Sequence, residues 1–269
     1  MLGVAILIIV MSVMNGFKTD LTKKILGLNP HVVVQSNGFI IDDFFINELR
    51  KKINNIEVAK AYSGEGIVVS NQNAKGIIIK GIDRNNKEAI KILKKNIIRG
   101  DINEFKRKTA FIGAELAFNL DLNVGDKLNL MSSSYIATPF GGIPKQETLY
   151  IAGIFNTGFF EFDHNFIFLN LSDALALFDK ETHEQDLEIY IEDPMKADIF
   201  KKKIQSLNKN FYVYSWSDLN KSFFSALKVE RNVMFIILTL IIIVAAFNII
   251  SGLTILIKNK TKEIAILKT

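Results

Sequence analysis

The chain has 269 residues, a formal net charge of +5 and no cysteine. Without cysteine it forms neither disulfide bonds nor thiolate metal sites. Five of the 33 basic residues and two of the 28 acidic residues follow Lys228, so 28 and 26 remain between Lys18 and Lys228. A segment so nearly neutral lacks the basic surface that nucleic-acid-binding proteins present to phosphates. We therefore expect no nucleic-acid partner.

An apolar segment opens the chain, from Leu2 to Met14. It is shorter than the roughly 17–25 residues that a transmembrane helix needs. A secretory signal would carry basic residues before such a segment and a small-residue cleavage pattern after it, and neither is present. We predict that residues 1–17 are the end of a first transmembrane helix, truncated here.

Two similar βαβ-like units are predicted in the soluble part of the chain, residues 18–228. The first has an alternating strand, His31 to Gln35, followed by Asp42 as the N-cap of an amphipathic helix. The second has a strand from Leu187 to Ile191, the N-cap pair Asp193-Pro194, and a strand from Phe211 to Tyr214. We expect these strands to pair in one sheet.

A different pattern separates the two units. Residues 83–185 contain shorter apolar strands and brief helices near Glu88, Glu115 and Asp173. This pattern predicts a β-rich subdomain, residues 83–185, inserted into a βαβ-type subdomain made of 18–82 and 186–228.

Two of the four prolines lie between Ser132 and Gln146, around Gly141-Gly142. We expect this segment to be an irregular excursion between strands. Its apolar side chains favour a partner-binding surface. The alternative is a β-hairpin loop that folds back on its own domain.

The stretch from Val233 to Ile257 carries no charged side chain and is followed by three lysines. It is long enough to span a bilayer, and the lysines place its C-terminal end in the cytoplasm. We predict a second transmembrane helix at 229–257 and a cytoplasmic segment at 258–269. No proline follows Ser217, so one continuous helix could join the soluble domain to the membrane. Such a helix would act either as a mechanical link or as a simple stalk.

Catalytic patterns are sparse. The three histidines lack metal-ligand spacing, Asp163-His164 has no recognisable nucleophile, and Gly64-Glu65-Gly66 is too short to hold a phosphate. We predict no catalytic residue, no metal site and no cofactor on this chain.

Four stretches resemble the lipoprotein-releasing Lol permeases of the MacB/FtsX class of ATP-binding cassette (ABC) transporter subunits. The stretches are Val10 to Phe17 (VMSVMNGF), Lys228 to Asn232 (KVERN), Ala245 to Ile250 (AAFNII) and Glu263 to Leu267 (EIAIL). They span the chain in the family's order. The resemblance implies an α+β fold, a MacB-like periplasmic domain with a βαβ-type Porter subdomain and an inserted Sabre-like subdomain, flanked by transmembrane helices.

The resemblance also implies sites. The proline segment is similar to the Hook of LolC-type subunits, which captures the periplasmic carrier LolA; LolE-type subunits lack it. Where LolC members tend to have a basic residue after Gln146, this chain has Glu147, which departs from the pattern. The implied Hook residues are Thr138, Pro139, Phe140, Gly141, Gly142, Ile143, Pro144 and Gln146.

Other implied residues belong to the membrane part. Met11, Met14 and Phe17 would line the lipoprotein cavity, and Ala245, Asn248 and Gly252 share one helix face suited to close packing. The residues that would couple to the ATPase are Lys262, Glu263, Ile264, Ala265, Ile266 and Leu267.

The implied function is that of a multi-pass inner-membrane permease subunit with a large periplasmic domain. Its partners would be a LolD-like ATPase, a LolE-like subunit or second copy, a LolA-like carrier and the lipoprotein substrate. The motion would be driven by ATP on the separate ATPase subunit. The alternatives are a MacB- or FtsX-type permease for efflux or regulation, and a membrane-tethered periplasmic sensor domain.

Overall fold

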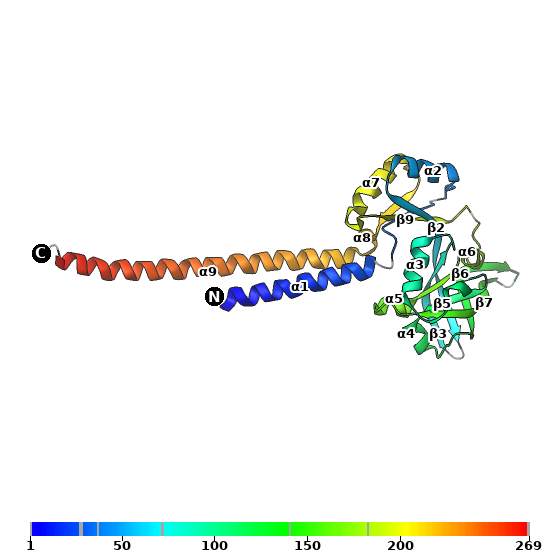
Figure 1. Cartoon of the computed structure of the whole chain (residues 1–269), viewed down its shortest axis with the longest axis horizontal. Coiled ribbons are helices and arrows are strands. Elements are labelled where there is room, and N and C mark those ends of the chain that lie inside the picture. The colour runs from blue at the N-terminus through cyan, green and yellow to red at the C-terminus, as the bar shows by residue number, and fades with distance from the viewer. Residues whose placement is uncertain are drawn as a thin grey trace. The chain divides into compact units, whose positions relative to one another are not determined.

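The computed structural model describes residues 2–26, 29–36, 38–70, 73–139, 141–181 and 183–267. Figure 1 labels most of the elements. The helices are α1 (Leu2–Leu26), α2 (Asp43–Lys52), α3 (Lys87–Asn96), η1 (Ile102–Glu104), α4 (Ala114–Asn119), α5 (Phe160–Asn165), α6 (Leu171–Leu177), η2 (Pro194–Lys196), α7 (Ala197–Leu207), α8 (Trp216–Leu219) and α9 (Lys221–Leu267). The strands are β1 (Val32–Gln35), β2 (Ile56–Ser70), β3 (Asn73–Ile82), β4 (Ile97–Gly100), β5 (Thr109–Gly113), β6 (Lys127–Thr138), β7 (Gly141–Phe155), β8 (Phe166–Asn170), β9 (Asp186–Ile191) and β10 (Tyr212–Ser215).

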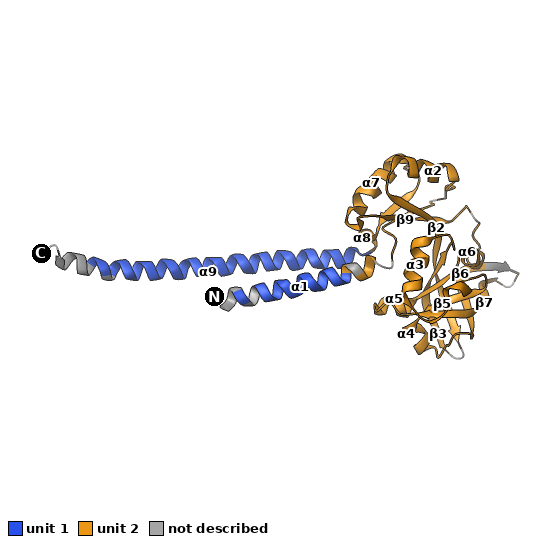
Figure 2. Ribbon diagram, in the orientation of Figure 1, with its two compact units in different colours: residues 1–21, 220–269 blue, residues 22–219 orange. Residues whose placement is uncertain are grey.

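The chain divides into two compact units, coloured separately in Figure 2. One unit comprises 1–21 and 220–269, and the other 22–219. The second unit is a few residues shorter at each end than the predicted soluble part, 18–228. The predicted subdivision of that part, with 83–185 inserted between 18–82 and 186–228, stays a prediction.

The two predicted βαβ-like units interlock in the unit formed by 22–219. The strand order β10-β1-β9-β2 is antiparallel at each step, so β1 and β2 run parallel with β9 between them. Likewise β9 and β10 run parallel with β1 between them. With α2 and α7 as the crossover helices, this is the split βαβ, ferredoxin-like arrangement. The expectation that these strands pair in one sheet is confirmed.

Strand β2 changes partners along its length. Its first half, up to Ala61, pairs with β9, and from Ala61 onward it pairs with β3. Beyond β3 the sheet continues through β8, β5, β7 and β4, and β6 pairs with both β2 and β7. Buried aliphatic side chains of these strands form a core with residues of α4 and α6. Since β2 belongs to both strand sets, it ties them together through backbone hydrogen bonds.

Local sequence signals explain where several helices begin. Asp42 caps α2 by accepting a hydrogen bond from the backbone N–H of Phe45, and Asn86 caps α3 in the same way from Ala89. Phe45 and Leu49 are buried, as the helical spacing predicts. Asp193-Pro194 begins η2, a 3₁₀ turn, and the α-helix begins only at Ala197.

Helix α9 is 47 residues long and contains the predicted span 229–257. Within the described residues, it is the one helix long and apolar enough to cross a membrane, over Lys221–Lys258. The helix does not continue from Ser217 as expected, because α8 ends at Leu219 and α9 begins after Asn220. The reason is local: Trp216 is buried and Asp218 accepts hydrogen bonds from Ser215, so α8 is held by its own unit.

The opening helix α1 is longer than the predicted apolar segment 1–17 and ends at Leu26. Its last turns belong to the unit formed by 22–219, where Thr22 and Ile25 are buried.

Candidate functional site

The segment predicted to be irregular, Ser132 to Gln146, is a β-hairpin, so that prediction was wrong. Strands β6 and β7 pair as far as Thr138 and Gly141, which leaves Pro139 and Phe140 as the two connecting residues. Phe140 lies outside the described residues. Proline is tolerated here because β6 pairs with β2 only up to Ser132 in the described structure, and beyond that point both strands are edges.

A bulge separates this hairpin end from the sheet. Met131 pairs with Gln146, whereas the next pair is Tyr135 with Pro144, so β6 has extra residues opposite Lys145. A bulge of this kind bends the strand and redirects the residues beyond it. We call residues 135–144 the ribbon. In the described structure, the two strands of the ribbon pair only with each other beyond the bulge.

The ribbon exposes apolar side chains. Tyr135 is 67% exposed and Ile143 is 53% exposed. Pro139, Gly141 and Gly142 are also exposed, and Pro144 is half-buried. A Cβ atom on Gly142 would lie 3.3 Å from the Cβ of Tyr135, so the glycine leaves room for the tyrosine ring beside it. The side chain of Thr138 is not among those described.

Two contacts fix the base of the ribbon to the body of the unit. The Ser134 hydroxyl donates a hydrogen bond of 2.7 Å to the carbonyl oxygen of Phe178. The Lys145 ammonium lies 2.7 Å from a carboxylate oxygen of Asp179. Both contacts reach the segment that follows α6. The ribbon therefore combines an anchored base with an exposed apolar end, as a docking element for a protein partner requires.

A depression of about 480 Å³ adjoins this base. Gln146 and Glu147 line it, together with Lys145 and residues of α6. Burial raises the pKa of Glu147 above its ordinary value, and the nearby Asp173 carboxylate adds to this effect. The side chain that departs from the family pattern thus faces the depression beside the ribbon.

The three residues predicted to line the lipoprotein cavity do not all line the same groove in the structure. Met11 and Met14 line a groove of about 330 Å³ in the unit formed by α1 and α9, with Phe224, Met234 and Leu238. Phe17 is exposed and does not line this groove.

The predicted packing face lies on α9. Ala245, Asn248 and Gly252 are exposed along it. The backbone of Lys262–Leu267 continues α9 without a break, and the side chains of these coupling residues are not described.

The polar residues that could suggest catalysis have structural roles. The Asp163 carboxylate accepts hydrogen bonds from Thr157 and Gly158, and His164 contacts Asn119. His31 is half-buried and accepts a hydrogen bond from the backbone N–H of Ile191 through Nδ1. Burial lowers the pKa of His31. No group of three or more metal-ligating side chains occurs among the described residues.

Sequence reasoning missed one group of polar residues. Asp186, Glu188 and Lys80 are buried in the unit formed by 22–219. A signal was available, because two acidic residues alternate with apolar ones in the strand from Asp186 to Ile191.

Comparison with known proteins places the chain in a family. The model of the family described as "MacB-like periplasmic core domain" matches residues 1–207. The chain therefore belongs to the class of proteins that carry this domain, and the MacB-like fold expected from the resemblance is confirmed. Within that class it is a member of the LolC/LolE group of lipoprotein-releasing system transmembrane proteins, because relatives from this group match it from end to end.

Three relatives match essentially the whole chain. The lipoprotein-releasing system transmembrane protein LolC of Neisseria meningitidis serogroup B is 29% identical over 100% of this chain and 66% of its own length. LolC of Haemophilus influenzae is 31% identical over 100% of this chain and 67% of its own length. LolE of Haemophilus influenzae is 25% identical over 100% of this chain and 66% of its own length. The chain thus spans about two thirds of the length of these relatives.

Proposed function

We propose that the chain is part of a LolC-like permease subunit of an ABC transporter, which releases lipoproteins from the inner membrane to a LolA-like periplasmic carrier. The observation that carries this proposal is the ribbon, an anchored hairpin with exposed apolar residues at the position of the implied Hook. Similarity along the whole chain supports it, with 31% identity to one LolC and 25% to the LolE of the same organism.

The proposed subunit works mechanically. It crosses the inner membrane several times, α9 being one of the spans. A LolD-like ATPase binds from the cytoplasm near residues 262–267, and a LolE-like subunit or second copy completes the transporter. ATP binding then moves α9 and the outer domain, and the lipoprotein passes to the carrier docked on the ribbon. Hydrolysis takes place on the ATPase subunit.

The test is binding of the organism's own LolA-like carrier to the purified chain in detergent micelles, measured by calorimetry. We expect micromolar or tighter affinity, and a loss of at least about tenfold in Phe140→Ala, because truncating an aromatic interface anchor typically costs a few kcal/mol. Phe118→Ala is the matched control, since Phe118 is 84% exposed on α4, away from the ribbon in the sequence. It should leave the affinity unchanged.

The outcome separates the candidate functions. Loss of binding in Phe140→Ala alone supports the carrier-docking role of the ribbon. A folded chain that does not bind the carrier would instead favour a MacB- or FtsX-type permease.

A further inference from the structure

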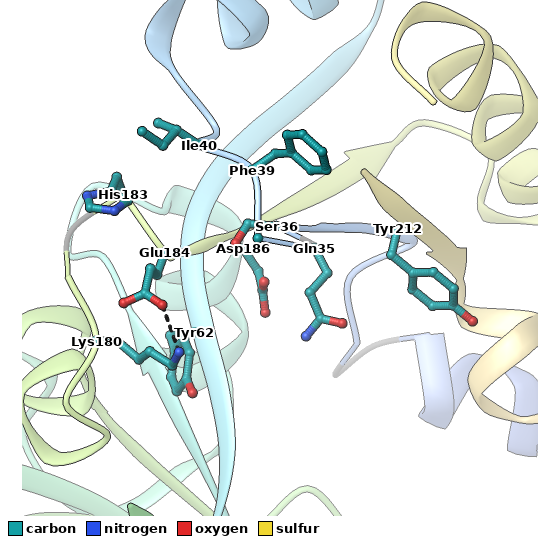
Figure 3. A pocket seen from close by; sticks show the side chains of 11 residues that line it. Gln35, Ser36, Phe39, Ile40, Tyr62, Lys180, His183, Glu184, Asp186 and Tyr212 are labelled. Carbon is teal, nitrogen blue, oxygen red and sulfur yellow. Dashed lines mark hydrogen bonds and ion pairs between the residues drawn. The ribbon is translucent and has the colours of Figure 1, made fainter. Parts of the chain in front are cut away.

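A cavity of about 500 Å³ lies in the unit formed by 22–219, and none of the described ribbon residues lines it. Figure 3 shows its walls, which come from the segment after β1, from β2, from the segment leading into β9, and from β10. The side chains that matter here are Gln35, Phe39, Tyr62, Lys180, Asp186 and Tyr212. The volume lies within the range of small-molecule sites.

The cationic side chain of this cavity is already paired. Lys180 Nζ lies 2.7 Å from Oε1 of Glu184, and the other oxygen of Glu184 accepts a hydrogen bond of 2.9 Å from the backbone N–H of Glu181. The two charges cancel locally. An anionic ligand would therefore have to displace Glu184 from Lys180.

The carboxylate of Asp186 has a different environment. Asp186 is 6% exposed, yet it lines the cavity between Gln35 and Tyr62 in Figure 3. The Gln35 side chain and the backbone N–H of Ser36 lie close enough to lower its pKa, and both are neutral groups. No ion pair to Asp186 occurs in the described part of the chain. The neighbouring acid, Glu188, is paired with Lys80 at 2.7 Å.

Aromatic rings complete the walls. Phe39 and Tyr212 are largely exposed at the cavity, and Tyr62 is half-buried beside Asp186. Ring faces attract organic cations, and the attraction is stronger where water is excluded. A buried carboxylate without a cationic partner, next to aromatic rings, complements an ammonium or guanidinium group in charge and in shape. A metal ion would need more oxygen ligands than the described residues bring together.

We propose that this cavity binds a small organic cation, whose primary ammonium or guanidinium group lies against Asp186 between the aromatic walls. The site shares Lys180 with the depression beside the ribbon base, and it goes beyond the proposed function. Its walls come from strands β1, β2, β9 and β10 and from the segments after β1 and before β9, so an occupied cavity would hold these two segments against each other. Binding to the folded state alone also stabilises it.

The pH dependence of binding follows from Asp186. Burial, and then the charge of Glu188, raise the pKa of Asp186 to about 7, against the lowering effects of Ser36, Gln35 and Lys180. Besides Glu188 and Lys180, the charged and titratable groups around the cavity are Glu184, His183, Tyr62 and Tyr212. A cation needs the ionised carboxylate, so its affinity should rise between pH 6 and pH 8.

The test is calorimetry at pH 8 on the full chain in detergent micelles, with 1,5-diaminopentane and agmatine as probes. The neutral control ligand is 1,5-pentanediol. We expect the cations to bind with a Kd below about 1 mM and the diol not to bind. N-acetyl-lysine methylamide forms a further arm: binding of this compound indicates a basic side chain of a polypeptide as the source of the cation, and binding of the free amines alone indicates a small molecule.

Two variants check the assignment. Asp186→Asn should weaken binding of the amines at least tenfold and abolish its dependence on pH, whereas Asp121→Asn, an exposed aspartate outside the cavity, should leave both unchanged. Tyr212→Ala, at an exposed position, should weaken binding severalfold without affecting the fold. Absence of binding to the folded chain, equal binding of the diol, or unchanged affinity in Asp186→Asn would overturn the proposal.

Discussion

Two buried acids on one strand show how single residues shape this domain. Asp186 and Glu188 are two positions apart on β9, so their side chains lie on the same face of the sheet. Glu188 is compensated by Lys80 and also accepts a hydrogen bond of 2.8 Å from the Tyr190 hydroxyl. Asp186 has no ion pair in the described part of the chain, although Lys180 lies near enough to lower its pKa. The two carboxylates should therefore respond in opposite ways to substitution.

Asp186→Asn should make the folded domain more stable at pH 8 and leave its stability nearly unchanged at pH 4. The pKa of Asp186 is about 7 in the folded chain and near 3.8 in the unfolded chain, so the folded chain holds this proton more tightly. The contribution of Asp186 to the stability of the wild-type domain therefore falls by roughly 1–4 kcal/mol as the pH rises from about 4 to about 7. Urea unfolding of both proteins between pH 4 and pH 8 measures this difference. A variant that is less stable at pH 8 would contradict the prediction.

Lys80→Met should destabilise the domain strongly, by about 3–5 kcal/mol, because it leaves the Glu188 carboxylate buried without its cation. The double variant Lys80→Met with Glu188→Leu should recover much of the loss. Lys106→Met is the matched control, since the Lys106–Glu104 pair is exposed and such pairs contribute about 1 kcal/mol or less. The measurement is the midpoint of thermal unfolding. Equal losses of stability from the two lysine substitutions would contradict the prediction that the buried ion pair contributes more than the exposed one.

At the scale of single elements, the sequence predicts what local signals determine. The cap at Asp42, the buried face through Phe45 and Leu49, and the existence of the strands β1, β9 and β10 all follow from short-range patterns. The same patterns failed between Ser132 and Gln146, where prolines and glycines indicated a loop. The prolines and glycines fit a hairpin because β6 pairs with β2 only up to Ser132 in the described structure. Beyond that residue, the outward-facing backbone N–H groups of the ribbon have no neighbouring strand, so a proline there removes no hydrogen bond of the sheet.

Other elements depend on contacts that are distant in sequence. Strand β5 lies between β7 and β8, and its short apolar run could not be distinguished from a buried turn of helix. The cavity around Asp186 likewise unites residues from Gln35 to Tyr212. Alternation within β9 indicated which residues share a face, but not that Lys80 would neutralise one acid and leave the other.

The hydrogen bond that anchors the base of the ribbon gives a prediction at the scale of single elements. Ser134→Ala removes the 2.7 Å hydrogen bond to the Phe178 carbonyl and should destabilise the domain by about 1 kcal/mol. If the ribbon docks the carrier, its affinity should also fall, because part of the binding energy is then used to order the ribbon. Calorimetry with the carrier and thermal unfolding measure the two effects. Asp179→Asn, which weakens the second contact at the same base, should have a smaller effect on both quantities, because an exposed ion pair contributes about 1 kcal/mol or less.

At the scale of the whole molecule, the unit formed by 22–219 has its own core and its own sheet. We predict that a fragment of residues 22–219 folds alone and unfolds in one cooperative transition, as single domains usually do. A fragment ending at residue 185 should not fold, because it lacks β9, which lies between β1 and β2. Circular dichroism and thermal unfolding compare the two. A cooperative transition in the shorter fragment would show that the inserted strands fold independently.

One of the two covalent junctions between the units bears on how the proposed transporter works; the other lies within α1, between Leu21 and Thr22. Asn220 alone separates α8 from α9, and its carbonyl oxygen accepts a hydrogen bond of 3.1 Å from the backbone N–H of Phe224 in the first turn of α9. On the other side of the junction, Trp216 donates a hydrogen bond of 2.9 Å to the carbonyl of Pro194, which fixes α8 within its unit. If α9 moves in the proposed transporter, we expect so short a connection to pass most of the displacement on to α8.

Two glycines inserted after Asn220 should therefore uncouple α9 from α8 and its unit, while α1 still joins the two units. In a reconstituted transporter containing the complete subunit, we expect ATP hydrolysis and carrier binding to persist while lipoprotein release falls at least tenfold, since a flexible linker absorbs the motion. The same insertion after Lys209, in the exposed turn between α7 and β10, lengthens the chain without lengthening this junction and should preserve release. Release that survives the insertion after Asn220 would mean that displacement of the outer domain by α9 is not the step that drives transfer.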